Sequence, residues 1–187
     1  MSAVLVLVVL AWLVHAFSQA DINYGTTGKF FTAENVIRGA GRTLLISVLA
    51  QAIGVGLGVL FAVMRLSHNP VTSAVAWFYI WLFRGTPVLV QLLIWYNLAL
   101  VFATIGGRPT SDLMTPFVAA LLGLGINEGA YMAEIVRSGI SSVDEGQTEA
   151  AQALGMTRAQ TLRRVVLPQA MRVIIPPTGN EFINMLK

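Results

Sequence analysis

Cysteine is absent from the 187-residue chain, and histidine occurs only twice, at His15 and His68. Disulfides, zinc thiolate sites and cysteine catalysis are therefore excluded, and two histidines so far apart predict no metal site. Charged residues are also scarce, at 11% of the chain against 56% hydrophobic residues. A soluble domain needs more polar surface than this, whereas charge confined to loops is typical of membrane helices.

A nucleotide-binding loop of the P-loop type is missing as well. Gly28 and Lys29 are followed by Phe30, and no glycine stands five positions before Gly28, so the phosphate-binding turn of that motif is excluded. The chain also lacks the His–Asp, Ser–Lys and paired-aspartate constellations that an intramembrane enzyme would use. We therefore predict a protein that is not an enzyme, has no cofactor, and takes any energy of ATP hydrolysis from a partner.

Long apolar segments alternate with short polar ones and predict an all-α fold, a polytopic transmembrane helical bundle. Thr43–Met64 carries no charge and is long enough to cross a bilayer. Leu113–Val136 spans again, and Gln169–Leu186 begins a further span. Three glycines in the first of these spans predict a surface on which another helix packs closely; they are Gly54, Gly56 and Gly58.

Two segments leave alternatives open. Residues 3–17 are apolar but short for a span, so they form either a membrane-associated or spanning helix or a signal peptide. Residues 21–39 are polar and predict an external loop. Residues 71–83 carry a cluster of aromatic side chains. This cluster predicts either a helix lying at the membrane interface or half of a bent spanning helix.

The positive charges predict the orientation. The larger group of arginines falls on the side of residues 142–168, which places that segment in the cytoplasm. The net charge of +3 is modest, and we assign it to membrane topology rather than to nucleic-acid binding. The arginines on the inner side are Arg65, Arg84, Arg137, Arg158, Arg163, Arg164 and Arg172; the opposite side carries Lys29, Arg38, Arg42 and Arg108.

The longest polar stretch runs from Ser142 to Pro168 and predicts two short helices joined at Gly155, where a left-handed cap favours glycine. We expect Pro168 to interrupt the second helix. A DNA-binding helix–turn–helix is the alternative, but the predicted spans on both sides keep a duplex from reaching it. Two residue pairs have capping-box spacing; they are Ser142 with Glu145 and Thr157 with Gln160.

The same stretch carries a family resemblance. Glu149, Ala150, Ala151, Gly155, Val165, Leu167 and Pro168 match, in order and spacing, the EAA loop of ABC-transporter permeases, with Val165 where isoleucine is usual. Three further stretches resemble the polar amino acid branch of the binding-protein-dependent importers. They are RGTPVLVQ at 84–91, NEGAYMAEIVRSGI at 127–140 and PQAMRVIIPPTGNEF at 168–182. The resemblance covers roughly residues 41–187.

The resemblance implies a transmembrane permease subunit of an ATP-driven amino-acid importer, multi-pass in the bacterial inner membrane. Residues 1–40 would be an N-terminal apolar segment with an external loop. Residues 41–187 would be a transmembrane domain, incomplete because such permeases continue beyond the helix that holds Lys187, with a cytoplasmic coupling loop at 138–168.

Partners and contact residues also follow from the resemblance. The implied partners are an ABC ATPase subunit, a second permease subunit that is identical or paralogous, a periplasmic or extracellular solute-binding protein and an amino-acid substrate, with no nucleic acid. The residues expected to couple the permease to the ATPase are Glu149, Ala150, Ala151, Gly155, Leu167 and Pro168.

Glu128 is the most informative single residue for the translocation path. A rise of about 1.5 Å per residue places it about 22 Å from Leu113, inside the hydrocarbon, where a carboxylate is costly and faces a cavity or a partner. It either meets a substrate ammonium group or forms a helix-packing hydrogen bond. Glu134 is expected to pair with Arg137 instead. The path candidates are Asn127, Glu128, Asn180 and Glu181, the last two after a helix break expected at Pro176-Pro177.

Overall fold

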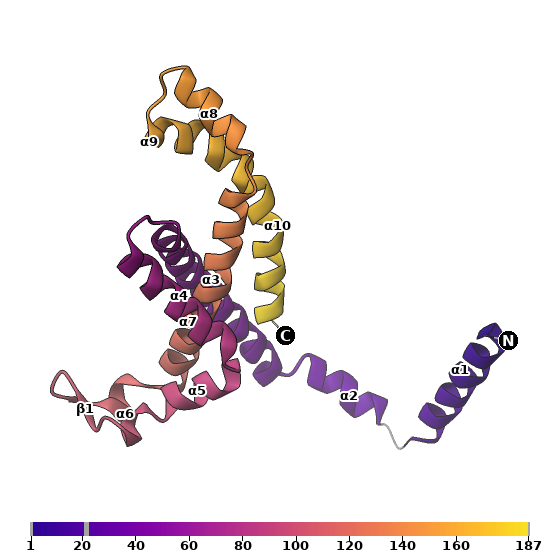
Figure 1. Cartoon of the computed structure of the whole chain (residues 1–187). Helices are drawn as coiled ribbons and strands as arrows, with labels where there is room; N and C mark the ends of the chain where they lie inside the picture. Colours follow the sequence, from indigo (N-terminus) through magenta and orange to yellow (C-terminus); the bar gives the residue numbers. More distant parts are fainter. Residues whose placement is uncertain (1, 21–22, 187) are drawn as a thin grey trace. The chain divides into compact units, whose positions relative to one another are not determined.

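The computed structural model describes residues 2–20 and 23–186 and is almost entirely helical (Figure 1). Contacts within the chain divide it into two compact units, residues 1–42 and residues 43–187. The second unit holds every residue proposed for the path and for coupling. Asp21 and Ile22, at the start of the predicted external loop, lie outside the described residues.

The first unit contains α1 (Ser2–Gln19), α2 (Tyr24–Phe31) and the first residues of α3. α2 lies where a polar loop was predicted. It forms because the Asn23 side chain accepts a hydrogen bond from the Thr26 amide at 2.9 Å, which satisfies a free N–H group of the first turn. The predicted loop is thus helical from Tyr24 to Phe31. The external position of this segment and the two alternatives for the apolar N-terminal run stay predictions.

α3 (Glu34–Arg65) has 32 residues and is therefore about 48 Å long. By length and composition it can cross a membrane, and it contains the predicted span Thr43–Met64. Small residues recur every three or four positions on one side of this helix, so a second helix can approach it closely. The buried members of this stripe are Ser47, Ala50, Gly54, Gly58 and Ala62.

α4 (Pro70–Gly85) and α5 (Val88–Tyr96) meet at an angle of 99°. The Asn69 side chain begins α4 by accepting hydrogen bonds from the amides of Val71 at 2.9 Å and Thr72 at 3.3 Å. Together the two helices are apolar enough to form one broken span or a re-entrant loop. Both alternatives for the aromatic segment, an interfacial helix and half of a bent spanning helix, therefore stay predictions.

A short polar connection links α5 to α7 where an outer loop was predicted. Its two strands pair antiparallel, with Ile105 opposite Arg108. Gly106 and Gly107 form the turn between them with φ values of 58° and 79°, which other residues rarely adopt. The elements of the connection are η1 (Leu98–Leu100), β1 (Thr104–Ile105), β2 (Arg108–Pro109) and α6 (Thr110–Leu113).

α7 (Pro116–Ser141) is the central helix of the second unit and packs against α4, α5 and α10 (Figure 1). With 26 residues it is about 39 Å long. Close contacts are made over its glycines: the Tyr79 hydroxyl of α4 donates to the Ile126 carbonyl at 2.6 Å and lies directly above Gly129. A Cβ atom at Gly129 would lie 2.5 Å from that hydroxyl oxygen, so only glycine fits.

Two of the three glycines predicted for helix packing serve that purpose. A Cβ atom at Gly54 would overlap the side chain of Glu128, and one at Gly58 would lie 2.9 Å from the carbonyl carbon of Met132. Gly56 has nothing within 4 Å of such an atom, because the helical period places it on another face of α3. The prediction is confirmed for Gly54 and Gly58, and for Gly56 it stays a prediction, since no helix of the described residues packs over it.

The C-terminal part of the chain forms a helical hairpin that continues into α10. A compact apolar cluster joins α3, α7 and α10 and contains Ala62, Met132, Val136, Ala170 and Ile174. The elements, in order, are α8 (Glu145–Ala153), α9 (Arg158–Thr161), the π-helical turn η2 (Leu162–Val166) and α10 (Leu167–Met185).

The helix break expected at Pro176 and Pro177 is not present, because α10 continues through both prolines. Each proline lacks the N–H group that would bond the carbonyl four residues earlier. Immediately after them the Thr178 hydroxyl donates to the Ile174 carbonyl at 2.8 Å, which adds a side-chain bond to this turn. Glu181 therefore lies on a regular helix rather than on irregular backbone.

Candidate functional site

Glu128 is buried, with 4% of its surface exposed, on the side of α7 that meets Gly54 of α3. The Gln51 side-chain amide donates to its carboxylate at 3.4 Å. A helix-packing hydrogen bond is thus present, with a partner that sequence reasoning missed. Ser47 and Gln51 are four residues apart in an otherwise apolar run, and this spacing was the available signal for a polar face on α3.

The bend between α4 and α5 is stabilised by two side-chain amides. Gln91 donates to the Phe83 carbonyl at 3.0 Å, to the Thr86 carbonyl at 3.1 Å and to the Thr86 hydroxyl at 2.7 Å. Asn127 of α7 donates to the same Phe83 carbonyl at 2.9 Å and to the Gln91 side-chain oxygen at 3.2 Å. A break in a membrane helix frees carbonyl groups that need new donors. Asn127 therefore stabilises the bend.

Gln91 was not singled out from the sequence, although it is 5% exposed and central to this network. The signal was its position as the one polar residue in the apolar helix VLVQLLIWY. Its partners lie on the preceding turn and on α7, which a local pattern does not reveal.

A cavity of about 720 Å³ lies between the α4–α5 bend, α7 and α10. It brings together three of the four path candidates, Asn127, Glu128 and Glu181. Asn180 is exposed and does not line it, because the next residue on a helix points about 100° away.

The charged groups of this cavity have both signs. The carboxylates of Glu128 and Glu181 face the same space as the guanidinium of Arg84. Arg84 lies over the ring of Tyr131, with its Cζ atom 5.2 Å from the ring centroid. A cation over an aromatic face is stabilised without an acidic partner, so Arg84 remains available to bind an anion.

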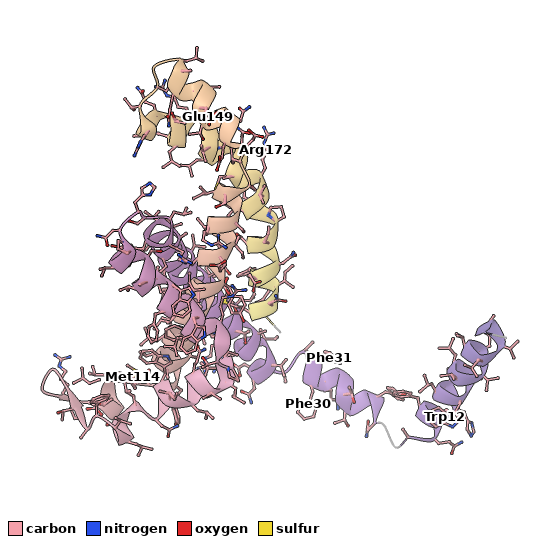
Figure 2. All side chains as sticks on the ribbon, viewed as in Figure 1. Trp12, Phe30, Phe31, Met114, Glu149 and Arg172 are labelled. Carbon is pink, nitrogen blue, oxygen red and sulfur yellow. The ribbon has the colours of Figure 1, made fainter. Side chains whose placement is uncertain are left out.

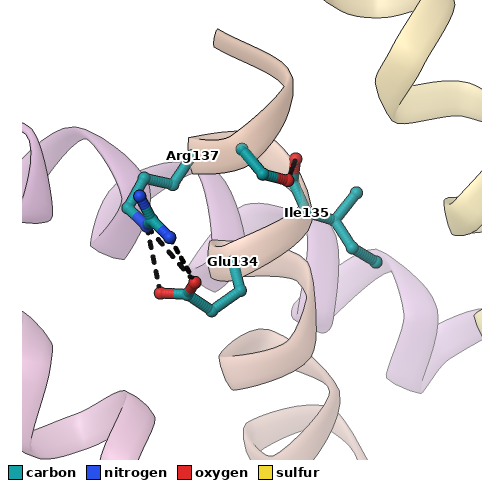
Figure 3. A network of polar contacts seen from close by, with 4 residues as sticks. Glu134, Ile135 and Arg137 are labelled. Atoms are coloured by element: carbon teal, nitrogen blue, oxygen red, sulfur yellow. Dashed lines mark hydrogen bonds and ion pairs between the residues drawn. The ribbon is translucent and has the colours of Figure 1, made fainter. Parts of the chain in front are cut away.

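Glu134 and Arg137 form the ion pair predicted from their spacing (Figure 3). Arg137 donates from Nη2 to Glu134 Oε2 at 2.7 Å and from Nε to Oε1 at 3.1 Å. Two parallel charge-assisted bonds of this kind fix both side chains. The predicted ion pair is thereby confirmed. It holds Glu134 away from the cavity that Glu128 and Glu181 line.

The polar segment folds as the predicted pair of short helices. At the second helix, the Gln160 backbone N–H donates to the Thr157 hydroxyl at 3.3 Å, and the Thr157 backbone N–H donates to the Gln160 side-chain oxygen at 2.9 Å. This is the predicted capping box. Gly155 between the helices has φ +82°, the left-handed conformation expected for it.

The first predicted capping box is wrong. Asp144 begins α8, because its carboxylate accepts a hydrogen bond from the Gly146 amide at 2.7 Å. Ser142 instead follows the end of α7, and its hydroxyl donates back to the Gly139 carbonyl at 2.8 Å. α7 is thus longer than expected, so the residue that begins the next helix lies two positions later.

The residues matched to the EAA loop are mostly on the surface of the hairpin. Glu149 projects from α8 (Figure 2), whereas Ala151 is buried within the hairpin. Leu154, beside the left-handed glycine, is 85% exposed and was not singled out from the sequence. An apolar side chain so fully exposed at a turn is available to enter a groove on another protein. The other exposed members are Ala150, Gly155, Leu167 and Pro168.

Pro168 does not interrupt the helix that precedes it. The Leu167 amide donates to the Leu162 carbonyl five residues earlier, as in a π-helix. In an α-helix the ring of Pro168 would press on the carbonyl of Arg164, and the wider turn accommodates this ring. The predicted interruption is therefore wrong, and α9, η2 and α10 follow one another without a break.

Comparison with known protein families shows which family the chain belongs to. Residues 54–187 match the model of the binding-protein-dependent transport system inner membrane component. The chain belongs to this family. The motif resemblance in the sequence and the predicted fold class are confirmed.

Several relatives are named for amino-acid transport. The chain is 46% identical over 192 aligned residues to the arginine transport system permease protein ArgU of Corynebacterium glutamicum, covering 100% of this chain and 61% of the relative. It is 40% identical to the glutamine transport system permease protein GlnP of Escherichia coli, covering 81% of this chain and 67% of that protein.

Solved structures show the same fold. An amino acid ABC transporter crystallised with histidines superposes with a TM-score of 0.77 at 41% identity, covering 89% of this chain and 73% of that one. The MetNI methionine ABC transporter, at 21% identity and a TM-score of 0.64, shares the fold.

Proposed function

We propose that this chain is a transmembrane permease subunit of an ATP-driven amino-acid importer, forming the translocation path and coupling it to a separate ATPase. The cavity that joins Glu128, Glu181 and Arg84 carries the proposal. A free amino acid has an ammonium group and a carboxylate at a fixed short distance. A cavity with carboxylates and a guanidinium offers a charge-assisted partner to each end.

The balance of charge in the cavity favours a cationic amino acid. Two carboxylates face one guanidinium, so a solute with two positive groups and one carboxylate would neutralise the site. Arg84 would bind the carboxylate, and Glu128 and Glu181 would bind the two cationic groups. The similarity to a permease named for arginine transport supports this choice.

The hairpin formed by α8 and α9 would be the contact with the ATPase. Its exposed residues Glu149, Ala150 and Gly155, with Ala151 supporting them from inside, present a small, partly apolar end, and Leu167 and Pro168 are exposed at the start of α10. We infer a second permease subunit, identical or paralogous, and an external solute-binding protein as the further partners. The family's description as part of a binding-protein-dependent system supports these partners.

Glu128→Gln in the full-length permease tests the path. Glutamine keeps the shape and an oxygen that can accept the bond from Gln51, so packing against α3 is preserved. We expect uptake affinity for a cationic amino acid to fall about ten- to a hundredfold, equivalent to roughly 1.5–3 kcal/mol for a lost charge-assisted hydrogen bond. The measurement is the concentration dependence of uptake, together with the yield of assembled complex.

Glu134→Gln is the matched control, because it removes the same charge from a position outside the cavity. Its uptake affinity should remain close to that of the wild type. Normal affinity but poor assembly for Glu128→Gln would contradict a substrate contact and leave Glu128 with a packing role alone.

The orientation can be tested directly because the chain contains no cysteine to remove. Gln152→Cys in α8 should react with a membrane-impermeant thiol reagent only when the cytoplasmic side is accessible. Ser111→Cys, in α6 before α7, should react in intact cells. Gly107 is unsuitable for this purpose because its φ of 79° strains other residues. Labelling of Gln152→Cys in intact cells would reverse the proposed topology.

A further inference from the structure

A second cavity, of about 500 Å³, adjoins the first and shares with it the wall formed by Arg84 and Gly85. Its own lining is different in character. Two arginines, Arg65 at the end of α3 and Arg137 on α7, lie with Glu134 beside the indole rings of α4. The proposed path does not use these residues, and the family resemblance assigns no role to them.

The lining of this second cavity has an excess of positive charge, because three arginines, the shared Arg84 included, stand against one carboxylate, Glu134. Glu134 neutralises Arg137 through the bidentate pair described above. Arg65 donates to the Ser73 hydroxyl at 2.7 Å, and no acidic group lies in ion-pair contact with it among residues 2–20 and 23–186. An arginine near a membrane requires an anionic partner or access to the headgroup region.

The aromatic residues indicate where the cavity lies relative to the bilayer. Trp77 and Trp81, one turn apart on α4, have ring centroids 6.0 Å apart and are 51% and 57% exposed. Indole rings with this exposure are typical of the membrane–water interface. Arg65 is the last residue of the spanning helix α3, which places the cationic end of the cavity at the same boundary.

We propose that this cavity binds the phosphate group of an anionic phospholipid in the cytoplasmic leaflet. Arg65 provides the uncompensated charge, Arg137 lies beside it, and Trp77 and Trp81 pack against the glycerol and the upper acyl chain. Basic pockets between membrane helices on the cytoplasmic side have the chemistry required for such headgroups. The site rests on the cytoplasmic orientation inferred above but does not depend on which solute is carried.

Lipid retention by the full-length permease assembled with its ATPase tests the proposal. The complex is reconstituted in nanodiscs of equal parts phosphatidylglycerol and phosphatidylcholine, extracted in detergent, and its bound lipids are quantified by mass spectrometry. We expect the wild type to retain phosphatidylglycerol preferentially. Arg65→Gln should lower this preference about fivefold, the equivalent of about 1 kcal/mol for one arginine near the surface.

Three further variants separate the charge from its structural surroundings. Ser73→Ala removes the hydrogen bond of Arg65 but keeps its charge, so the preference should remain. Arg172 lies on the exposed face of α10 (Figure 2), so Arg172→Gln should also retain the preference for phosphatidylglycerol. Glu134→Gln frees the charge of Arg137 and should raise the preference by a similar factor, which keeps the test informative if Arg65→Gln fails to assemble.

Four results would overturn the proposal. The first is an unchanged lipid preference in Arg65→Gln; if that variant fails to assemble, an unchanged preference in Glu134→Gln counts instead. The second is an equal loss of preference in Arg172→Gln, which would indicate an effect of general surface charge. The third is displacement of phosphatidylglycerol by excess inorganic phosphate, which would indicate a site for free anions. The fourth is displacement by excess arginine, which would assign the cavity to the translocation path. Loss of lipid preference with normal uptake affinity would leave the proposed function intact.

Discussion

Gly155→Trp is expected to separate ATP hydrolysis from uptake, with a loss of uptake of more than about tenfold while the subunit remains in the membrane. Two effects combine at this position. The left-handed backbone costs any L-residue roughly 1–2 kcal/mol, and an indole would stand on the end of the hairpin that we propose as the ATPase contact. Within the chain, a Cβ atom at Gly155 meets nothing within 4 Å, so the steric part of the effect would come from the partner. The readouts are uptake and ATPase activity in proteoliposomes.

Gly155→Asn is the control for the backbone, because asparagine tolerates the left-handed region better than other residues. We expect it to retain most of the uptake activity. An equal loss in both variants would attribute the effect to the turn itself. Normal uptake in Gly155→Trp would exclude this end of the hairpin as the coupling contact.

Gly58→Leu is expected to prevent assembly of the permease. The added Cβ atom would lie 2.9 Å from the carbonyl carbon of Met132 and 3.1 Å from the Ala133 amide nitrogen. Because both contacts are to the backbone, no side-chain rotation relieves them, and α3 must move away from α7. Overpacking of this kind costs about 3 kcal/mol or more. The yield of monodisperse complex and its thermal midpoint in detergent measure the effect.

Gly56→Leu is the matched control on the same helix, two residues away. Its added side chain meets nothing within 4 Å of the Cβ position in this chain, and leucine has the higher helix propensity. Yield and thermal midpoint should therefore stay near the wild-type values. Equal losses for both variants would show that the approach of α3 to α7 is not what the glycines provide.

Local patterns predicted those features whose causes lie within a few residues. The capping box of Thr157 and Gln160 and the pairing of Glu134 with Arg137 are of this kind, because each partner lies three positions away. The left-handed conformation of Gly155 follows the same rule. The predicted span Thr43–Met64, which lies within α3, was also predictable, because the bilayer requires long apolar runs.

Features that depend on distant partners were missed. Gln51 bonds Glu128, 77 positions along the chain, and Asn127 donates to a carbonyl 44 positions before it. A sequence pattern shows that such residues are polar in apolar surroundings, but it does not show which groups they meet. Asn127 therefore entered as a path candidate, although its amide stabilises the bend.

Proline was overestimated as a helix breaker for a related reason. At Pro168 a π-turn takes up the ring, and at Pro176 and Pro177 the helix continues although Pro176 is exposed. Side-chain hydroxyls can supply bonds where proline removes a backbone donor, as Thr178 does to the Ile174 carbonyl. The rule that proline ends helices holds best where no such bond compensates for the lost one.

The helical course from Arg158 to Met185 is continuous in sequence, with no loop between α9, η2 and α10, although it includes a π-helical turn and two prolines. One end of this helical course belongs to the hairpin proposed to meet the ATPase, and the other carries Glu181 into the cavity. A tilt imposed at the first end would therefore reach the second through continuous helical backbone rather than through a loop. Nucleotide-driven closure would in this way act mechanically on a carboxylate that we propose binds the solute.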